Sequence, residues 1–185
     1  KQINEWLRKL VIQQELSYAK YPLDCPSYTN VEINVDWTTG TKLTLTQFEE
    51  CINIGTSRAA VEALWAITSG DKLYGINALN TYIMFLNMLR QDGSHILESV
   101  RHREAHYKSV FNVALMVIVA EAIYKSTGYD TYKIERNGLT ILDAMKFLSE
   151  SAVKPELIHK YSPTALDDQK QFKDQWHWLV INRFH

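Results

Sequence analysis

The chain has 185 residues, of which 46% are hydrophobic and 22% charged, a composition typical of a globular protein and unlike that of disordered or collagen-like chains. Lys and Arg total 20 against 21 Asp and Glu, giving a formal net charge of −1, which excludes a strong overall attraction for nucleic acid or an anionic bilayer. The longest apolar run, residues 113–120, is too short to span a membrane. We therefore expect a soluble protein with neither nucleic acid nor membrane as a partner.

The start of the chain predicts one helix followed by an extended segment. Apolar residues recur at helical spacing over residues 2–20, and Tyr21-Pro22 ends that pattern. From about residue 30 to residue 45 apolar and polar residues alternate, which indicates a small β-hairpin or extended loop. Trp37 lies in its turn, where an aromatic ring could stack on a sugar.

The rest of the chain predicts a series of helices joined by short turns. Thr46 and Glu49 have capping-box spacing, so a helix is expected from Thr46 to Thr68, with Gly55 as a candidate interruption and Gly70 as its stop. Further helices are expected over residues 72–90, 109–126 and 139–151, and a last aromatic segment ends the chain. Turns are expected at residues 91–93 and at residue 128.

This series predicts a mainly all-α fold of antiparallel helix pairs. We expect residues 1–185 to form a single helical domain. Because the chain begins at Lys1 without Met, we also expect it to be a truncated or processed part of a longer protein. The two cysteines, Cys25 and Cys51, are too few for a disulfide framework or a structural zinc site, although one bridge between them is allowed in an oxidising compartment.

A basic stretch at residues 101–108 is the strongest candidate for chemistry. Two arginines, two histidines, a tyrosine and a lysine share eight positions: Arg101, His102, Arg103, His106, Tyr107 and Lys108. If the stretch is helical, residues four apart share one face. Arginine presents a fork suited to a carboxylate, and positive charge beside a tyrosine stabilises its phenolate. Such a set can bind a carboxylate and remove a proton from the adjacent carbon.

Three other interpretations of this stretch remain open. It can be a solvated face between two apolar helices, with Glu98 and Arg101 as an ordinary helix ion pair. His102 and His106 have the spacing of zinc ligands, but no third ligand is evident from the sequence. The cations can also hold nucleic-acid phosphates, which one short patch in a neutral chain supports weakly.

The order of residues from Asn53 to Leu148 resembles the C-terminal half of the alginate lyase-like polysaccharide lyases, which are helical toroids. The resemblance rests on an Asp-Gly turn, a Glu, paired Arg, a Tyr, an alanine-containing helix and a following turn, and on closing Trp and Arg-Phe residues: Asp92-Gly93, Glu98, Arg101, Arg103, Tyr107, Ala120-Glu121, residues 128–132, Gly138-Leu139, Trp176 and Arg183-Phe184. It implies an (α/α) toroid-like arrangement and a uronic-acid polymer, alginate or polymannuronate, as substrate.

By this resemblance Tyr107 is the catalytic tyrosine and Arg101 or Arg103 engages the substrate carboxylate. The family commonly has Asn-Asn-His upstream, where this chain has the run Asn53-Ile-Gly-Thr-Ser-Arg58. Asn53 can stand for one asparagine, but the histidine is absent. Three alternatives follow: His102 or His106 supplies the base, Tyr107 acts alone, or the activity is lost or changed.

The resemblance implies β-elimination, with Arg and Asn donors stabilising charge on the carboxylate and a tuned base removing the proton. We expect catalytic roles for Tyr107, Arg101, Arg103, His102 and His106, and substrate contacts from Asn53, Arg58, Trp37 and Lys108. No cofactor and no metal is expected, the partner is an anionic polysaccharide, and the substrate class implies a periplasmic or secreted protein. The alternative function is a noncatalytic carbohydrate-binding domain or a helical interaction scaffold. Other aromatic residues could line a sugar groove, although most should be core: Trp65, Tyr74, Tyr82, Trp176 and Trp178.

Overall fold

The computed structural model describes residues 5–6, 8–10 and 51–165. Residues 5–6 and 8–10 are helical, which agrees with the expected N-terminal helix as far as they extend. The rest of that helix, the hairpin expected near residues 30–45 and the final aromatic segment lie outside the described residues. The expected helix start at Thr46 and the loop residue Trp37 lie outside them as well.

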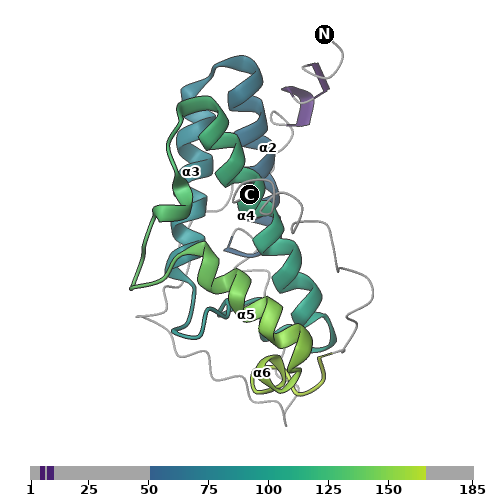
Figure 1. The fold of residues 1–185 in the computed structure, drawn as a ribbon. Coiled ribbons are helices and arrows are strands. Elements are labelled where there is room, and N and C mark those ends of the chain that lie inside the picture. The colour runs from purple at the N-terminus through teal and green to yellow at the C-terminus, as the bar shows by residue number, and fades with distance from the viewer. Residues whose placement is uncertain (1–4, 7, 11–50, 166–185) are drawn as a thin grey trace.

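Three long helices form the main body of the described region (Figure 1). They are α2 (Asn53–Ser69), α3 (Lys72–Asn87) and α4 (Ala105–Thr127). Helix α2 packs against both α3 and α4, and α2 and α3 form a tight antiparallel pair because only two residues connect them. The described residues contain helices and two isolated β-bridges but no strand, so the all-α prediction is confirmed for them.

The predicted helix stops are confirmed by the backbone. Gly70 and Gly128 adopt left-handed conformations with φ of 75° and 72°, and their N–H groups bond to the carbonyls of Ala66 and Tyr124. Glycine adopts this conformation without a Cβ clash, so it can end a helix. Gly55, in contrast, lies inside α2 and does not interrupt it.

Helix α4 is the central helix of the described region. It begins at Ala105, earlier than the predicted Ser109, and its inner side chains include Met116, Val117 and Ala120, all with 0% exposure. Together with residues 102–104 it is long and apolar enough to cross a membrane, but half of its most apolar stretch is buried inside the protein. A core helix passes the same test, and α4 is packed against α2, α3 and α5.

Two shorter helices, α5 (Ile141–Val153) and α6 (Glu156–His159), follow α4. A capping box starts α5, in which Thr140 accepts the N–H of Leu142 and the carboxylate of Asp143 accepts the N–H of Thr140. Helix α5 packs against α4 and leads to α6 at one end of the molecule (Figure 1).

The connection between α3 and α4, residues 88–104, is long and almost wholly buried over residues 93–100. Arg90 holds it together, because its guanidinium donates to the hydroxyls of Ser94 and Ser99 and to the carbonyls of His95 and Ile96. The same guanidinium lies 4.2 Å above the centre of the Tyr161 ring. A connection fixed in this way can hold side chains in a defined place.

The turn at residues 91–93 is where the connection meets the two last helices. Asp92 accepts hydrogen bonds from Lys160 Nζ at 2.6 Å and from the Tyr161 hydroxyl at 2.7 Å, and these contacts hold the pKa of Asp92 low, at about 2, although burial opposes them. Gly93 has a φ of 86°, and a Cβ at this position would lie 2.3 Å from the carbonyl oxygen of Asp143 in α5. The turn therefore requires glycine for both conformation and space.

Candidate active site

The candidate site is built around Glu98, a carboxyl side chain with no solvent exposure. Ile52, the residue before α2, offers no side-chain cap. The N–H of Asn53 instead donates to Glu98 Oε1 at 2.7 Å, across 45 residues of sequence. The same oxygen accepts from Asn112 Nδ2 of α4 at 3.4 Å. Glu98 thus ties the first turn of α2 to α4, and a carboxylate is favoured where a helix exposes N–H groups.

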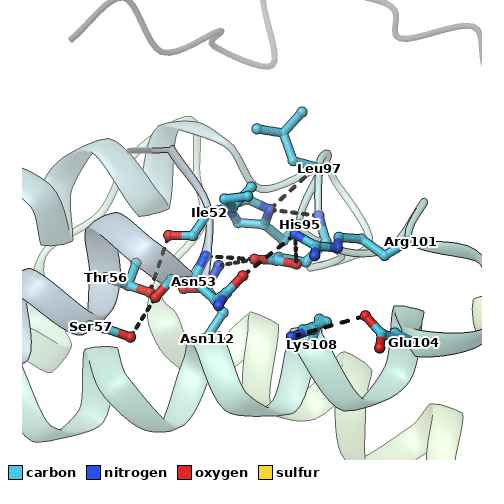
Figure 2. A network of polar contacts seen from close by, with 11 residues as sticks. Ile52, Asn53, Thr56, Ser57, His95, Leu97, Arg101, Glu104, Lys108 and Asn112 are labelled. Atoms are coloured by element: carbon cyan, nitrogen blue, oxygen red, sulfur yellow. Dashed lines mark hydrogen bonds and ion pairs between the residues drawn. The ribbon is translucent and has the colours of Figure 1, made fainter. Parts of the chain in front are cut away.

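Arg101 reaches the same point from the end of the connection (Figure 2). Its Nη1 lies 3.4 Å from Asn53 Oδ1 and 3.6 Å from Glu98 Oε2. The Arg101 side chain keeps 16% of its surface exposed, whereas that of Glu98 keeps none. The guanidinium therefore lies between a buried carboxyl and solvent, where a ligand carboxylate can reach it.

Burial raises the pKa of Glu98 to about 7. The positive charges of Arg101 and Lys108 and the hydrogen bond from the N–H of Asn53 oppose this rise, and the negative charge of Glu104 adds to it. Desolvation exceeds these favourable contacts because the carboxylate loses all its contact with water. Glu98 can therefore gain or lose a proton near neutral pH.

His95 lies one turn before Glu98 and is also buried. Its Nδ1 accepts the N–H groups of Leu97 and Glu98, each at 3.2 Å (Figure 2), and its ring stacks on Phe85. Burial, with a smaller effect of Arg90, lowers the pKa of His95 to about 3. The neutral imidazole thus fixes the backbone that carries Glu98, and His95 is part of the structure of the connection.

The basic stretch is not one continuous α-helix. Residues 102–104 form a 3-10 turn before α4, and His102 has a φ of 52°. His102 and Arg103 are exposed, while the carbonyl of His102 accepts the Ser162 hydroxyl at 2.8 Å. The condition under which residues four apart would share one α-helical face is therefore not met for Arg103 with Tyr107 or for His102 with His106, because α4 begins only at Ala105.

Tyr107 lies in the first turns of α4 with 36% of its surface exposed. Its ring stacks on Phe111, with the centroids 6.2 Å apart, and Lys108 Nζ lies 5.2 Å from its ring centroid. Lys108 also forms an ion pair with Glu104 at 4.0 Å (Figure 2). Tyr107 is therefore open to a ligand and has a cation beside it.

The other predicted residues have different surroundings. Arg58 forms an ion pair with Glu62 at 3.5 Å on α2, and both side chains are largely buried, which is a structural contact within the helix. His106 is half-buried in the first turn of α4. Tyr82 is fully buried and its hydroxyl donates to the carbonyl of Thr131, so it belongs to the core, as expected for most of the aromatic residues.

Asn112 and His95 were missed from the sequence, and Glu98 was given as a residue of the family motif and as a surface ion-pair partner of Arg101, without a role at the site. A signal was present, because Glu98 follows directly on the apolar pair Ile96-Leu97, and a carboxyl in an apolar run is expected to need buried partners. No sequence signal pointed to Asn112, because the orientation of α4 about its axis against α2 decides whether this side chain reaches Glu98.

The helices and their order place the chain among the α/α-toroid proteins. The sequence model described as alginate lyase matches residues 35–158, more than half of the chain. The chain therefore belongs to the alginate lyase family. No curated protein sequence gives a significant match.

Three solved structures of alginate lyase A1-III are similar to the chain. The structure of the enzyme from Sphingomonas species A1 covers 98% of this chain at 21% identity, with a TM-score of 0.75. A histidine-to-alanine variant complexed with tetrasaccharide covers 65% at 25% identity, and a tyrosine-to-phenylalanine variant complexed with tetrasaccharide covers 66% at 24% identity, both with a TM-score of 0.63. The chain spans 45%, 35% and 35% of these three structures, so it corresponds to less than half of their length.

Proposed function

We propose that the chain is a polysaccharide lyase that cleaves an anionic uronic-acid polymer, of the alginate or polymannuronate kind, by β-elimination. The observation that carries this proposal is the meeting of Arg101 and Asn53, which are 48 residues apart in sequence and 3.4 Å apart at their side chains. A guanidinium and an amide that converge beside solvent can hold a planar carboxylate. Membership of the alginate lyase family makes a uronate the fitting ligand.

The reaction begins with the carboxylate of the sugar. Its adjacent carbon is a very weak acid, and donors on the carboxylate oxygens stabilise the charge that develops when the proton leaves. Arg101 and Asn53 supply these donors. The proton is removed from that carbon, the bond to the glycosidic oxygen at the next carbon breaks, a double bond forms in the ring, and the leaving oxygen takes up a proton.

Tyr107 is the group assigned to both proton transfers. Its exposure on α4 makes it accessible to the sugar, and Lys108 Nζ lies 5.2 Å from the centroid of its ring. As a phenolate it accepts the proton, and as a phenol it returns a proton to the leaving oxygen. The tetrasaccharide complexes of alginate lyase A1-III carry a tyrosine-to-phenylalanine or a histidine-to-alanine replacement, which supports roles for these two residue types in the family.

The histidine of the family pattern has no counterpart at Asn53-Ile-Gly, so His102 and His106 are the candidates to replace it. His102 is exposed on the 3-10 turn and His106 lies one turn further on. We expect His102→Gln or His106→Gln to lower the elimination rate at least tenfold if that imidazole is the base. An unchanged rate in both variants would assign the base role to Tyr107 alone.

The test is to follow the ultraviolet absorbance of the unsaturated uronate while the protein is incubated separately with alginate, polymannuronate, polyglucuronate and glycosaminoglycans. We expect absorbance to rise on at least one of these polymers and expect Tyr107→Phe to remove the rise while leaving the circular dichroism spectrum unchanged. No rise on any polymer would contradict the proposal.

A noncatalytic carbohydrate-binding domain is the second candidate, and the missing histidine favours it. A binding domain would retain the polymer on an affinity gel without shortening it. In that case Arg101→Ala would weaken retention, whereas Tyr107→Phe would leave both the polymer length and its absorbance unchanged.

We also propose that the protein acts in the periplasm or outside the cell. Cys51 is disulfide-bonded, and disulfides persist mainly in oxidising compartments; Cys25 lies outside the described residues. Alkylating thiols in intact source cells before lysis, followed by mass spectrometry, should find Cys51 unmodified. Complete alkylation of Cys51 would place the protein in a reducing compartment.

A further inference from the structure

The contacts of Glu98 suggest a role beyond holding the fold. Two hydrogen bonds, from the N–H of Asn53 and from Asn112 Nδ2, go to Oε1, whereas Oε2 faces Arg101 at 3.6 Å and accepts no hydrogen bond from the described residues. Oε2 is therefore the oxygen that can take a proton without breaking a hydrogen bond. The side chain has no exposure, so Glu98 cannot touch a ligand itself and can act only through Arg101 and Asn53.

We propose that Glu98 is a positioning residue whose protonation controls how strongly Arg101 and Asn53 hold the carboxylate of a uronate. This inference rests on the proposed function, because it concerns the same ligand and the same site. When Glu98 is ionised, it offsets the charge of Arg101 from the buried side. When Glu98 is protonated, the full charge of Arg101 is available to the ligand carboxylate.

Electrostatic linkage predicts how protonation of Glu98 and binding of the ligand affect each other. A ligand carboxylate at Arg101 places a second negative charge close to Glu98, and two carboxylates that share one cation do not both stay ionised readily. Binding should therefore drive proton uptake by Glu98, and protonation of Glu98 should strengthen binding by the same factor. The pKa of Glu98, already about 7 through burial, makes this exchange available near neutral pH.

Charged and polar groups from the elements around Glu98 act on its carboxyl group. Arg101 and Glu104 belong to the same connection, Lys108 belongs to α4, and all three affect the Glu98 carboxyl electrostatically. From the α2 side, Asn53 contributes a neutral amide and a backbone N–H. His102 and His106 also lie next to this site in the chain, and imidazoles often gain a proton in the same pH range, so variants must separate their contribution.

The experiment measures binding of a mannuronate tetrasaccharide to Tyr107→Phe, which the proposed function expects not to cleave it, by titration calorimetry. A neutral mannose tetrasaccharide is the control ligand, and the further variants are made in the same Tyr107→Phe background. At about pH 7 the titration is run in two buffers with different ionisation enthalpies, which reports protons taken up on binding. We expect net proton uptake with the mannuronate ligand, none with the neutral ligand, and binding on the order of tenfold tighter at about pH 5.5 than at about pH 8.5, within the usual range for coupled sites.

A Glu98 variant and two controls identify the group that takes up the proton. Glu98→Gln should remove the uptake and reduce the pH effect to less than about twofold. Glu150→Gln makes the same change on α5, at a side chain that is 51% exposed and is not among the groups that act on Glu98, and it should preserve both. His102→Gln with His106→Gln should also leave uptake present if Glu98 is the group that titrates.

The outcomes distinguish this inference from the proposed function. Uronate binding without proton uptake, or uptake that persists in Glu98→Gln, would overturn the role of Glu98 and leave the lyase proposal standing. Failure to bind any uronate at either pH would overturn both proposals. If Glu98→Gln does not fold, the titration of Tyr107→Phe in two buffers, with and without the two histidine substitutions, still decides the question.

Discussion

His95 and Glu98 are ionisable side chains that are both buried in the connection between α3 and α4. Their pKa values are shifted in opposite directions. Each shift disfavours the charged form, and in each case burial is the largest cause. His95 remains neutral and accepts backbone N–H groups, so it is a structural residue. Glu98 keeps a cation beside it and can change charge near neutral pH. The sequence could not separate these two roles, because burial decides them and burial depends on the packing of α2 and α4.

Stability should depend on pH through Glu98. Its pKa rises from the ordinary value of 4.5 to about 7 on folding, so the folded state binds this proton more tightly than the unfolded chain. Its contribution is therefore most favourable below about pH 4.5 and is lost as the pH rises to about 7, by about 3 kcal/mol. His95 acts in the opposite direction, since its pKa falls from 6.5 to about 3 and acidification below about 6.5 destabilises the fold.

The contribution of Glu98 can be isolated by urea unfolding of wild type and Glu98→Gln between about pH 4.5 and 8. The stability of the variant relative to wild type should improve as the pH rises, because the amide cannot ionise. Glu150→Gln, at an exposed position on α5, should show a nearly constant difference. A constant difference for Glu98→Gln as well would show that Glu98 does not change protonation on folding.

The two arginines of the basic stretch should differ in their effect on the uronate. Arg101 contacts Asn53 and Glu98, whereas Arg103 is exposed on the 3-10 turn. Lysine keeps the charge but loses the fork, so Arg101→Lys should lower kcat/KM about tenfold or more, and Arg103→Lys should change it less than about threefold. Steady-state kinetics on the cleaved polymer decide this, and equal losses in both variants would contradict the assignment to Arg101.

At the scale of the elements, the glycine helix stops were predicted correctly, whereas the start of α4 and the interruption expected at Gly55 were wrong. Gly70 and Gly128 end their helices because glycine alone enters the left-handed region cheaply, and this property is local to the sequence. The start of α4 at Ala105, and the continuity of α2 through Gly55, depend on packing against neighbouring helices. Such tertiary contacts override local preference.

Gly93 provides a prediction about the connection that carries the site. A Cβ at this position would collide with the carbonyl of Asp143 in α5, at 2.3 Å, and φ is 86°. Gly93→Ala should therefore cost about 2–4 kcal/mol. Gly128→Ala is the matched control, because its φ is 72° but nothing lies within 4 Å of the added Cβ, and it should cost about 1–2 kcal/mol. Urea unfolding measures both, and equal costs would mean that the contact with α5 does not constrain the turn.

For the whole molecule, the sequence predicted the all-α class from the helical spacing of apolar residues and the short turns between them, and the family from a set of motif residues. The structure and the family match confirm both. The pairing of Asn53 with Arg101 could not be predicted from spacing, because residues 48 apart meet only when α2 and the connection pack together. The chain corresponds to less than half of the length of the alginate lyase A1-III structures, so the proposed activity has to be measured on this chain itself.

The most direct test of elimination by this chain is mass spectrometry of the products formed from a mannuronate tetrasaccharide, with Tyr107→Phe as the control. The account predicts an unsaturated product lighter by one water molecule than the corresponding hydrolysis product, formed by wild type and absent with Tyr107→Phe. Intact tetrasaccharide, or fragments that have gained water, would contradict a lyase mechanism at the site formed by Arg101, Asn53 and Tyr107.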